Sequence, residues 1–135
     1  MNTLPEKLMV GGTVHPATPK RKSKYKKHRR FLRKFVYAGL PDLNTGFDSP
    51  LVVHLSPEDF LTVIDRCEAL HVCISGIEVF STDVEPPCRA AFVDYNIPIP
   101  PEDGYEWARQ FVRQYEGDFD ITICATFGVP DSVYK

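Results

Sequence analysis

A run of positive charge between residues 20 and 34 constrains this chain most, because so many like charges cannot be buried together in a core. The run holds ten of the sixteen lysine and arginine residues and no acidic residue. Its basic residues are Lys20, Arg21, Lys22, Lys24, Lys26, Lys27, Arg29, Arg30, Arg33 and Lys34. The folded body is therefore expected in the remainder of the chain.

The rest of the charge is segregated in the opposite sense. Residues 1–34 hold 11 basic residues and one acidic residue, a formal charge of +10, whereas residues 35–135 hold 17 acidic and 5 basic residues, a formal charge of −12. The net charge of −2 thus conceals a basic arm joined to an acidic body, which attract each other as well as outside partners. We predict an irregular, basic N-terminal arm over residues 1–38 and an acidic domain over residues 39–135.

Residues 23–38 of this arm have two interpretations. Aromatic and apolar side chains recur at near-helical spacing from Tyr25 to Val36, ahead of Gly39 and Pro41, which favours a helix that ends there. A solvated arm without regular structure is the alternative.

Two helices are predicted in the body. The first begins at Ser56-Pro57, because Ser is a good N-cap, Pro suits the first helical position and the acids that follow face the positive end of the helix dipole. Apolar residues then recur at spacings of three and four from Phe60 to Leu70. The second helix spans residues 103–116, with Asp103 as its cap and Gly117 as a left-handed exit.

Four short strands are predicted around these helices. Residues 51–55 alternate, residues 71–80 form a nearly continuous apolar run in which Gly76 marks a bulge or a close backbone approach, and residues 90–95 form a third strand. In residues 119–127 every second side chain, starting with Phe119, is apolar and expected to be buried. The order predicts an α+β fold, a single mostly antiparallel sheet of about four strands with two helices on one face, preceded by the basic arm.

The cysteines and the hydropathy bear on the compartment. Four cysteines without a CxxC pair, three of them within apolar patterns, predict buried hydrophobic groups in a reducing compartment. No apolar run approaches the length of a membrane span and no leader is recognised, so we expect a cytoplasmic protein with no membrane partner.

No catalytic motif is recognised, whether a GxSxG elbow, a P-loop or an HExxH helix. His71-x-Cys73 with Cys88 approaches a zinc deaminase pattern, but Cys73 itself stands where the catalytic Glu is required and Ala91 where the second Cys is required. His54 and His71 are expected to be satisfied, partly buried residues at strand ends. The sequence predicts a protein that is not an enzyme and has no cofactor and no metal ligand.

Three stretches carry a resemblance to known proteins. Ser56-Pro57-Glu58-Asp59 opens a helix, Ser75-Gly76-Ile77-Glu78-Val79-Phe80 follows in a strand, and Asp94-Tyr95-Asn96 precedes the second helix. In this order, residues 39–127 resemble a small immunity-protein family of bacterial polymorphic toxin systems. That family has paired glycines and an Asp in the strand, an aromatic residue after the Asn, and no basic arm. The resemblance implies a non-catalytic protein that binds and neutralises a cognate toxin.

The acidic body agrees with an inhibitor of a basic nuclease, which it would bind rapidly and in a salt-dependent way. The candidate toxin-binding residues are Glu78, Asp83, Glu85, Asp94, Glu102 and Asp103. The alternative is that these charges only keep a folded domain soluble.

The basic run offers a second function, that of a nucleic-acid-binding accessory protein. Lys and Arg would displace counterions from phosphate, and Tyr25 and His28 would stack on bases. Three other interpretations stay open: a localisation signal, an arm folded back on the acidic body, and an extension without function.

Overall fold

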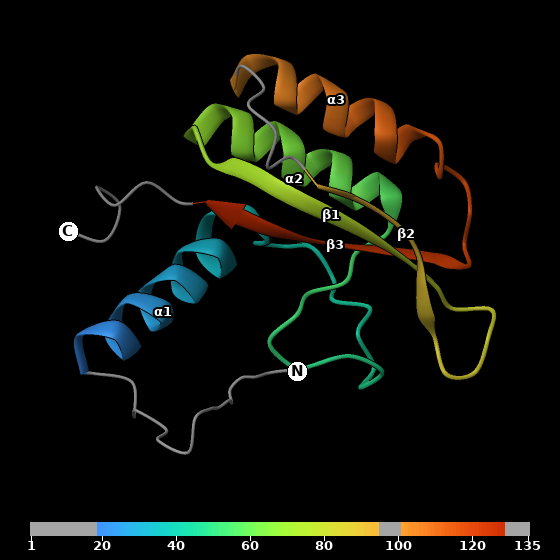
Figure 1. Cartoon of the computed structure of the whole chain (residues 1–135), viewed down its shortest axis with the longest axis horizontal. Coiled ribbons are helices and arrows are strands. Elements are labelled where there is room, and N and C mark those ends of the chain that lie inside the picture. Colours follow the sequence, from blue (N-terminus) through green and yellow to red (C-terminus); the bar gives the residue numbers. More distant parts are fainter. Residues whose placement is uncertain (1–18, 95–100, 129–135) are drawn as a thin grey trace.

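A computed structural model describes residues 19–94 and 101–128, with side chains described over 24–93 and 103–128. It is an α+β structure of three helices and one three-stranded antiparallel sheet (Figure 1). The elements are α1 (Pro19–Phe31), the π-helical turn η1 (Leu32–Val36), α2 (Pro57–Leu70), β1 (Cys73–Ser81), β2 (Cys88–Asp94), α3 (Pro101–Arg113) and β3 (Ile121–Gly128). Within these residues no helix has the length and apolarity needed to cross a membrane.

Helix α2 begins and ends at the residues that its sequence indicates. The Ser56 hydroxyl accepts a hydrogen bond from the Asp59 N–H at 3.1 Å, and Pro57 opens the first turn. The apolar stripe that starts at Phe60 is buried. The helix ends at His71, which adopts a left-handed φ of 58° and donates its N–H to the carbonyls of Cys67 and Glu68. His71 is exposed, so the expectation of partial burial is wrong for this residue.

The sheet has the strand order β2-β1-β3, with β1 in the centre and both pairs antiparallel. The register between β1 and β3 shifts between Ile74 and Gly76, which confirms the bulge expected there. A side chain at Gly76 would meet Thr126 Oγ1 at 3.2 Å, so glycine permits this close approach. Successive residues of a strand point to opposite faces of the sheet. We call the face that carries Ile77 and Val79, which are buried, the inner face.

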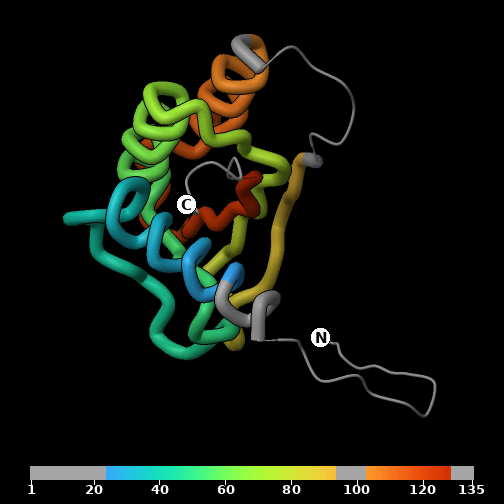
Figure 2. Tube along the Cα trace, turned by 90° about the vertical axis from the view of Figure 1, so that its left-hand side faces the viewer, coloured from blue at the N-terminus to red at the C-terminus, as the bar shows by residue number. Residues whose placement is uncertain are grey.

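Helices α2 and α3 lie side by side on the inner face of the sheet (Figure 2). Their buried side chains join those of the strands in one core. The core residues are Val36, Leu55, Phe60, Val63, Ile64, Cys67, Val72, Ile74, Ile77, Val79, Tyr105, Ala108, Val112, Ile121 and Ile123. An ion pair of Arg109 with Asp65 at 2.9 Å links the two helices at the surface.

The basic run forms a helix whose far end is held by the body. Val36 at the end of η1 is fully buried in the core. The Arg66 guanidinium on α2 donates to the carbonyls of Val36 and Ala38 at 3.0 and 2.8 Å. The positive charge of Arg66 also lies next to the negative, C-terminal end of the dipole of this helix, which is a favourable interaction. The helical interpretation of residues 23–38 therefore describes this segment.

The predicted strand over residues 51–55 is wrong, and the sheet has three strands instead of four. Only Leu55 pairs with β3, through two hydrogen bonds with Ile123 of 2.9 and 2.7 Å. In the preceding residues, the Val52 carbonyl accepts from Asn44 Nδ2 and the His54 N–H donates to Asp42. The Val52 N–H and the His54 carbonyl bond to the loop backbone, at Ser49 and Leu43. Asn and Asp side chains that satisfy the backbone in this way compete with a strand ladder.

Phe119 also departs from the prediction. The strand β3 starts at Ile121, and the Phe119 side chain is 97% exposed instead of buried. Gly117 has a left-handed φ of 82°, and the Asp120 N–H donates to the Asp118 carboxylate at 3.0 Å. This turn interrupts the alternation that the sequence shows.

The four cysteines are free. Cys67 and Cys124 are buried as predicted, whereas Cys73 and Cys88 are exposed at the surface, contrary to the prediction for them. Both exposed residues occupy the first position of a strand.

Replacing Ser56 with Ala should lower the free energy of unfolding by about 1 kcal/mol, because the first turn of α2 loses its side-chain acceptor. Urea denaturation followed by circular dichroism measures this loss. Thr45→Ala, which changes an exposed loop residue, is the control and should stay within about 0.5 kcal/mol of the native protein. Equal stability of the two variants would refute the capping role of Ser56.

Candidate functional site

The four predicted toxin-binding residues whose side chains the structure describes come from three different parts of the fold. Asp83 and Glu85 lie in the connection between β1 and β2, and Asp103 is exposed at the start of α3. Glu78 lies in the middle of β1 and pairs with Arg89 of β2 at 2.9 Å. Asp94 ends β2 and Glu102 lies in the first turn of α3, but both side chains lie outside the described part.

Carboxylates that the sequence did not single out join Asp83 and Glu85 at one end of the sheet. The Thr82 N–H donates to the Asp120 carbonyl at 2.8 Å, and Gly117 N–H donates to the Glu58 carboxylate at 2.7 Å. These bonds bring the β1–β2 connection, the α3–β3 connection and the start of α2 together, at the right of Figure 1. We define this surface, the acidic end, as Glu58, Asp83, Glu85, Glu116, Asp118 and Asp120, all exposed.

Phe119 lies within the acidic end, between Asp118 and Asp120. At 97% exposure it is the most exposed of the large hydrophobic side chains in the described part. Exposure of an aromatic ring to water is unfavourable in free energy, and contact with a partner surface would remove the ring from water. The acidic end thus combines an aromatic anchor with a charged rim.

The basic residues of α1 and η1 form a positively charged surface. Lys24, Lys26, Lys27, Arg29, Arg30, Arg33 and Lys34 are exposed, and Lys20, Arg21 and Lys22 belong to the same helix with side chains outside the described part. Tyr25 is also exposed, whereas His28 is partly buried. Burial, followed by the charge of Arg29, lowers the pKa of His28.

The basic helix and the acidic end lie at opposite ends of the molecule. Figure 1 shows α1 at the lower left and the acidic end at the right. In Figure 2, where the left side of Figure 1 faces the viewer, α1 lies at the front. The described part of the basic arm therefore does not fold back on the acidic end. The charge segregation of the sequence becomes a separation in space.

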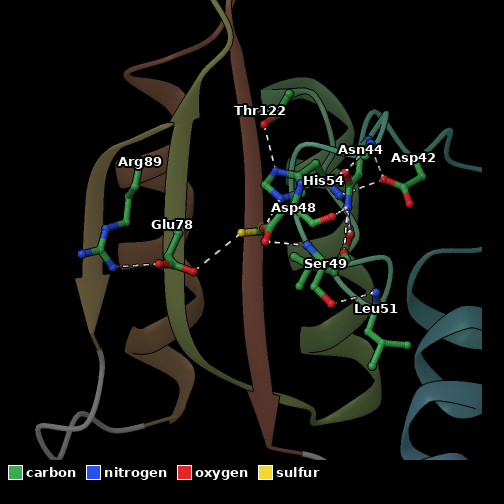
Figure 3. Close-up of polar contacts among 12 residues, drawn as sticks. Asp42, Asn44, Asp48, Ser49, Leu51, His54, Glu78, Arg89 and Thr122 are labelled. Atoms are coloured by element: carbon green, nitrogen blue, oxygen red, sulfur yellow. Dashed lines mark hydrogen bonds and ion pairs between the residues drawn. The ribbon is translucent and has the colours of Figure 1, made fainter. Parts of the chain in front are cut away.

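A buried polar network lies on the outer face of the sheet, where the loop over residues 41–54 covers β3 (Figure 3). The His54 side chain is fully buried, with Nδ1 2.9 Å from Thr122 Oγ1 and Nε2 2.8 Å from Asp48 Oδ2. A carboxylate only accepts, so Nε2 donates to Asp48, and in the neutral ring Nδ1 accepts from the Thr122 hydroxyl. Both ring nitrogens are satisfied, and the burial of His54 is complete where the sequence predicted a partly buried residue.

The loop holds His54 in place through its own polar side chains. Asp42 accepts from the His54 N–H at 3.0 Å, and the Asn44 amide donates to the Ser49 and Val52 carbonyls, each at 2.9 Å. The rings of Phe47 and Phe80 pack edge to face with the imidazole, each at 4.7 Å between centroids. The imidazole is fixed in position by the loop and the sheet together.

Cys124 lies next to this network on β3. Its Sγ lies 3.8 Å from Glu78 Oε1, opposite on β1. Burial raises the pKa of the Cys124 thiol to about 12, and the negative charges of Glu78 and Asp48 add to this. The thiol is therefore protonated and unreactive unless a cation offsets these effects.

No pattern along the chain groups Asp48, Cys124 or Phe119 with the other residues of the site. Asp48 and Cys124 are far apart along the chain, and Phe119 fits an apolar alternation. The residues of the pattern His71-x-Cys73 with Cys88 are separated in space, because Cys73 is the first residue of β1, whereas Cys88 pairs with Ser81 at the other end of this strand.

Comparison of the chain with models of protein families, with curated proteins and with solved structures gave no match.

Replacing Thr122 with Val should lower the free energy of unfolding by about 1 to 3 kcal/mol, because the buried His54 Nδ1 loses its partner while the side-chain shape is kept. Urea denaturation of both proteins measures the difference. Thr126→Val on the same face of β3, where the residue is exposed, is the control and should change stability by less than about 0.5 kcal/mol. Equal losses at the two positions would contradict a specific role of the network.

Proposed function

We propose that this protein is a non-catalytic inhibitor that binds and neutralises a positively charged toxin through the acidic end. The observation that carries the proposal is the 97% exposure of Phe119 among the carboxylates of this surface. Aromatic anchors surrounded by polar residues are the usual centres of binding energy at protein interfaces. The sequence resemblance to an immunity-protein family supports the same function.

The charge of the acidic end suits a basic partner. The six carboxylates come from the β1–β2 connection, the α3–β3 connection and the start of α2, and all are exposed. Exposed charges of one sign accelerate association with an oppositely charged surface and select against acidic partners. A toxin that acts on nucleic acid presents such a basic surface, because it must bind phosphates.

Phe119→Ala should weaken binding of the toxin at least about thirtyfold, mainly through faster dissociation, because the aromatic anchor is lost. Surface plasmon resonance measures both rate constants, with an inactivated toxin as the partner; a toxin encoded next to the gene of this protein is the first to be tried. Phe92→Ala, which removes a 59% exposed ring from β2, is the control and should change the affinity less than threefold. If Phe92→Ala weakens binding and Phe119→Ala does not, the partner binds elsewhere.

Removal of carboxylates should change the association rate constant instead of the dissociation rate constant. The triple variant Asp83→Asn, Asp118→Asn and Asp120→Asn should slow association roughly tenfold at low salt, with little effect at high salt, because steering depends on unscreened charge. The same assay, run over a range of salt concentrations, measures the change. Asp103→Asn, at the start of α3 and away from the acidic end, should leave the association rate unchanged; a slower association in that variant alone would refute the assignment of the surface.

A second candidate function is nucleic-acid binding by the basic helix. The observation that favours it is the attachment of this helix to the body through buried Val36 and Arg66, which presents its cations as an ordered row. A row of exposed Lys and Arg side chains binds phosphates with little sequence preference. Because Val36 belongs to the core, charge substitutions test this function better than deletion of the arm.

The triple variant Arg29→Gln, Arg30→Gln and Arg33→Gln should reduce the slope of log affinity against log salt by about 3 on duplex DNA, because three phosphate contacts are lost. Fluorescence anisotropy with duplex DNA and single-stranded RNA of unrelated sequences measures the slope. The matched Arg→Lys triple keeps the charges and should retain it. An unchanged slope in the Gln variant would show that the basic helix does not contact phosphate.

A further inference from the structure

Four side chains with metal-binding atoms converge on the outer face of the sheet. The ligand atoms of Asp48, His54 and Cys124 all lie within 4.8 Å of one another. Glu78 Oε1 lies 3.8 Å from the Cys124 sulfur, while its second oxygen pairs with Arg89. The four residues come from the loop over residues 41–54, from β1 and from β3.

We propose that Asp48, His54, Cys124 and Glu78 bind one zinc ion that ties this loop to the sheet. The inference is independent of the inhibitor function, because these side chains lie apart from the acidic end.

Two of the separations between ligand atoms lie within about half an ångström of those in a tetrahedral zinc site. With Zn–S of about 2.3 Å and Zn–N or Zn–O of about 2.0 to 2.1 Å, neighbouring ligand atoms are roughly 3.3 to 3.6 Å apart. The Asp48–His54 separation of 2.8 Å is shorter and the Cys124–Glu78 separation of 3.8 Å is longer. An increase of about 0.5 Å in the first separation and a decrease of about 0.2 Å in the second reach the tetrahedral values.

The kinds of donor atom select the metal. Imidazole nitrogen and thiolate sulfur favour zinc, whereas calcium and magnesium prefer sites made only of oxygen. Binding replaces the thiol proton of Cys124, which passes to solvent, with the metal ion. The carboxylates of Asp48 and Glu78 balance the positive charge of the ion.

The hydrogen bonds around His54 are those expected for a metal-binding histidine. When Nε2 binds the ion, the ring proton resides on Nδ1 and is donated to Thr122 Oγ1, 2.9 Å away, because a hydroxyl either donates or accepts. A hydrogen bond of this kind orients a metal-binding imidazole. Asp48 is oriented in the same way, since its Oδ1 accepts from the Ser49 N–H at 2.7 Å.

The site has a buried side and an accessible side. His54 and Cys124 are 0% and 3% exposed, whereas the carboxylate-bearing side chains of Asp48 and Glu78 are 28% and 41% exposed. Glu78 also lines a cleft of about 320 Å³ on the outer face, together with Arg89 and Phe92. Glu78 is therefore the ligand that an ion from solvent reaches most easily.

The test is a titration of untagged, chelator-treated full-length protein with Co²⁺, a spectroscopic substitute for zinc. We expect one equivalent to produce a thiolate-to-cobalt charge-transfer band and the visible bands of tetrahedral cobalt, both abolished by added Zn²⁺. Zinc at a hundredfold excess over its dissociation constant should also raise the melting temperature by roughly 10 °C. The proposal is overturned if the folded native protein gives no charge-transfer band.

Variants locate the ion. Cys124→Ser should abolish the charge-transfer band, whereas Cys73→Ser and Cys88→Ser, which change the two exposed thiols, should retain it. A band that survives in Cys124→Ser or disappears in Cys88→Ser places the metal elsewhere. If Cys124→Ser does not fold, Asp48→Asn is the deciding variant, because it keeps the shape and hydrogen bonds of the side chain. It should weaken Co²⁺ binding at least about tenfold. An unchanged affinity for Co²⁺ in Asp48→Asn would overturn the proposed site.

Discussion

Burial of the apolar stripe of α2 against the centre of the sheet is the interaction on which the rest of this structure depends. Phe60, Val63 and Ile64 are fully buried, as are Ile77 and Val79 of the central strand. Each such side chain contributes about 1.5 to 3 kcal/mol when removed from water. Because α2, α3 and η1 all meet on the inner face, this core fixes where the basic helix ends, where the acidic end forms and which face of the sheet remains for the loop.

The outer face is stabilised in a different way. The loop over residues 41–54 covers it with a polar network around His54, and the two flanking phenylalanine rings exclude water from the imidazole. Polar groups in such a place are favourable only when each has a partner, so the loop, β1 and β3 must come together as a unit. We infer that this requirement sets the conformation of the loop more than any strand propensity of its residues.

The two charged surfaces follow from the same architecture. Strand β1 runs from the end of α2 to the β1–β2 connection. This connection, the α3–β3 connection and the start of α2 meet there and bring their carboxylates together. The basic helix is attached beyond β3 by Val36 and Arg66, at the other end of the molecule. The separation keeps the charges from neutralising each other within one molecule, so both surfaces stay available to partners of opposite charge.

The amino-acid sequence by itself determined the local elements, because their causes are local. Ser56 and Pro57 start a helix through their own geometry, apolar spacing selects the buried face of α2, and Gly117 permits the left-handed turn after α3. Only the tertiary structure decided the rest. Residues 51–55 lost their strand to bonds from Asp42 and Asn44, Phe119 was exposed by the turn around Asp118, and His54 acquired partners from distant parts of the chain. Such outcomes depend on which groups compete for the same backbone atoms and side chains in three dimensions, and alternation or spacing along a chain carries no record of that competition.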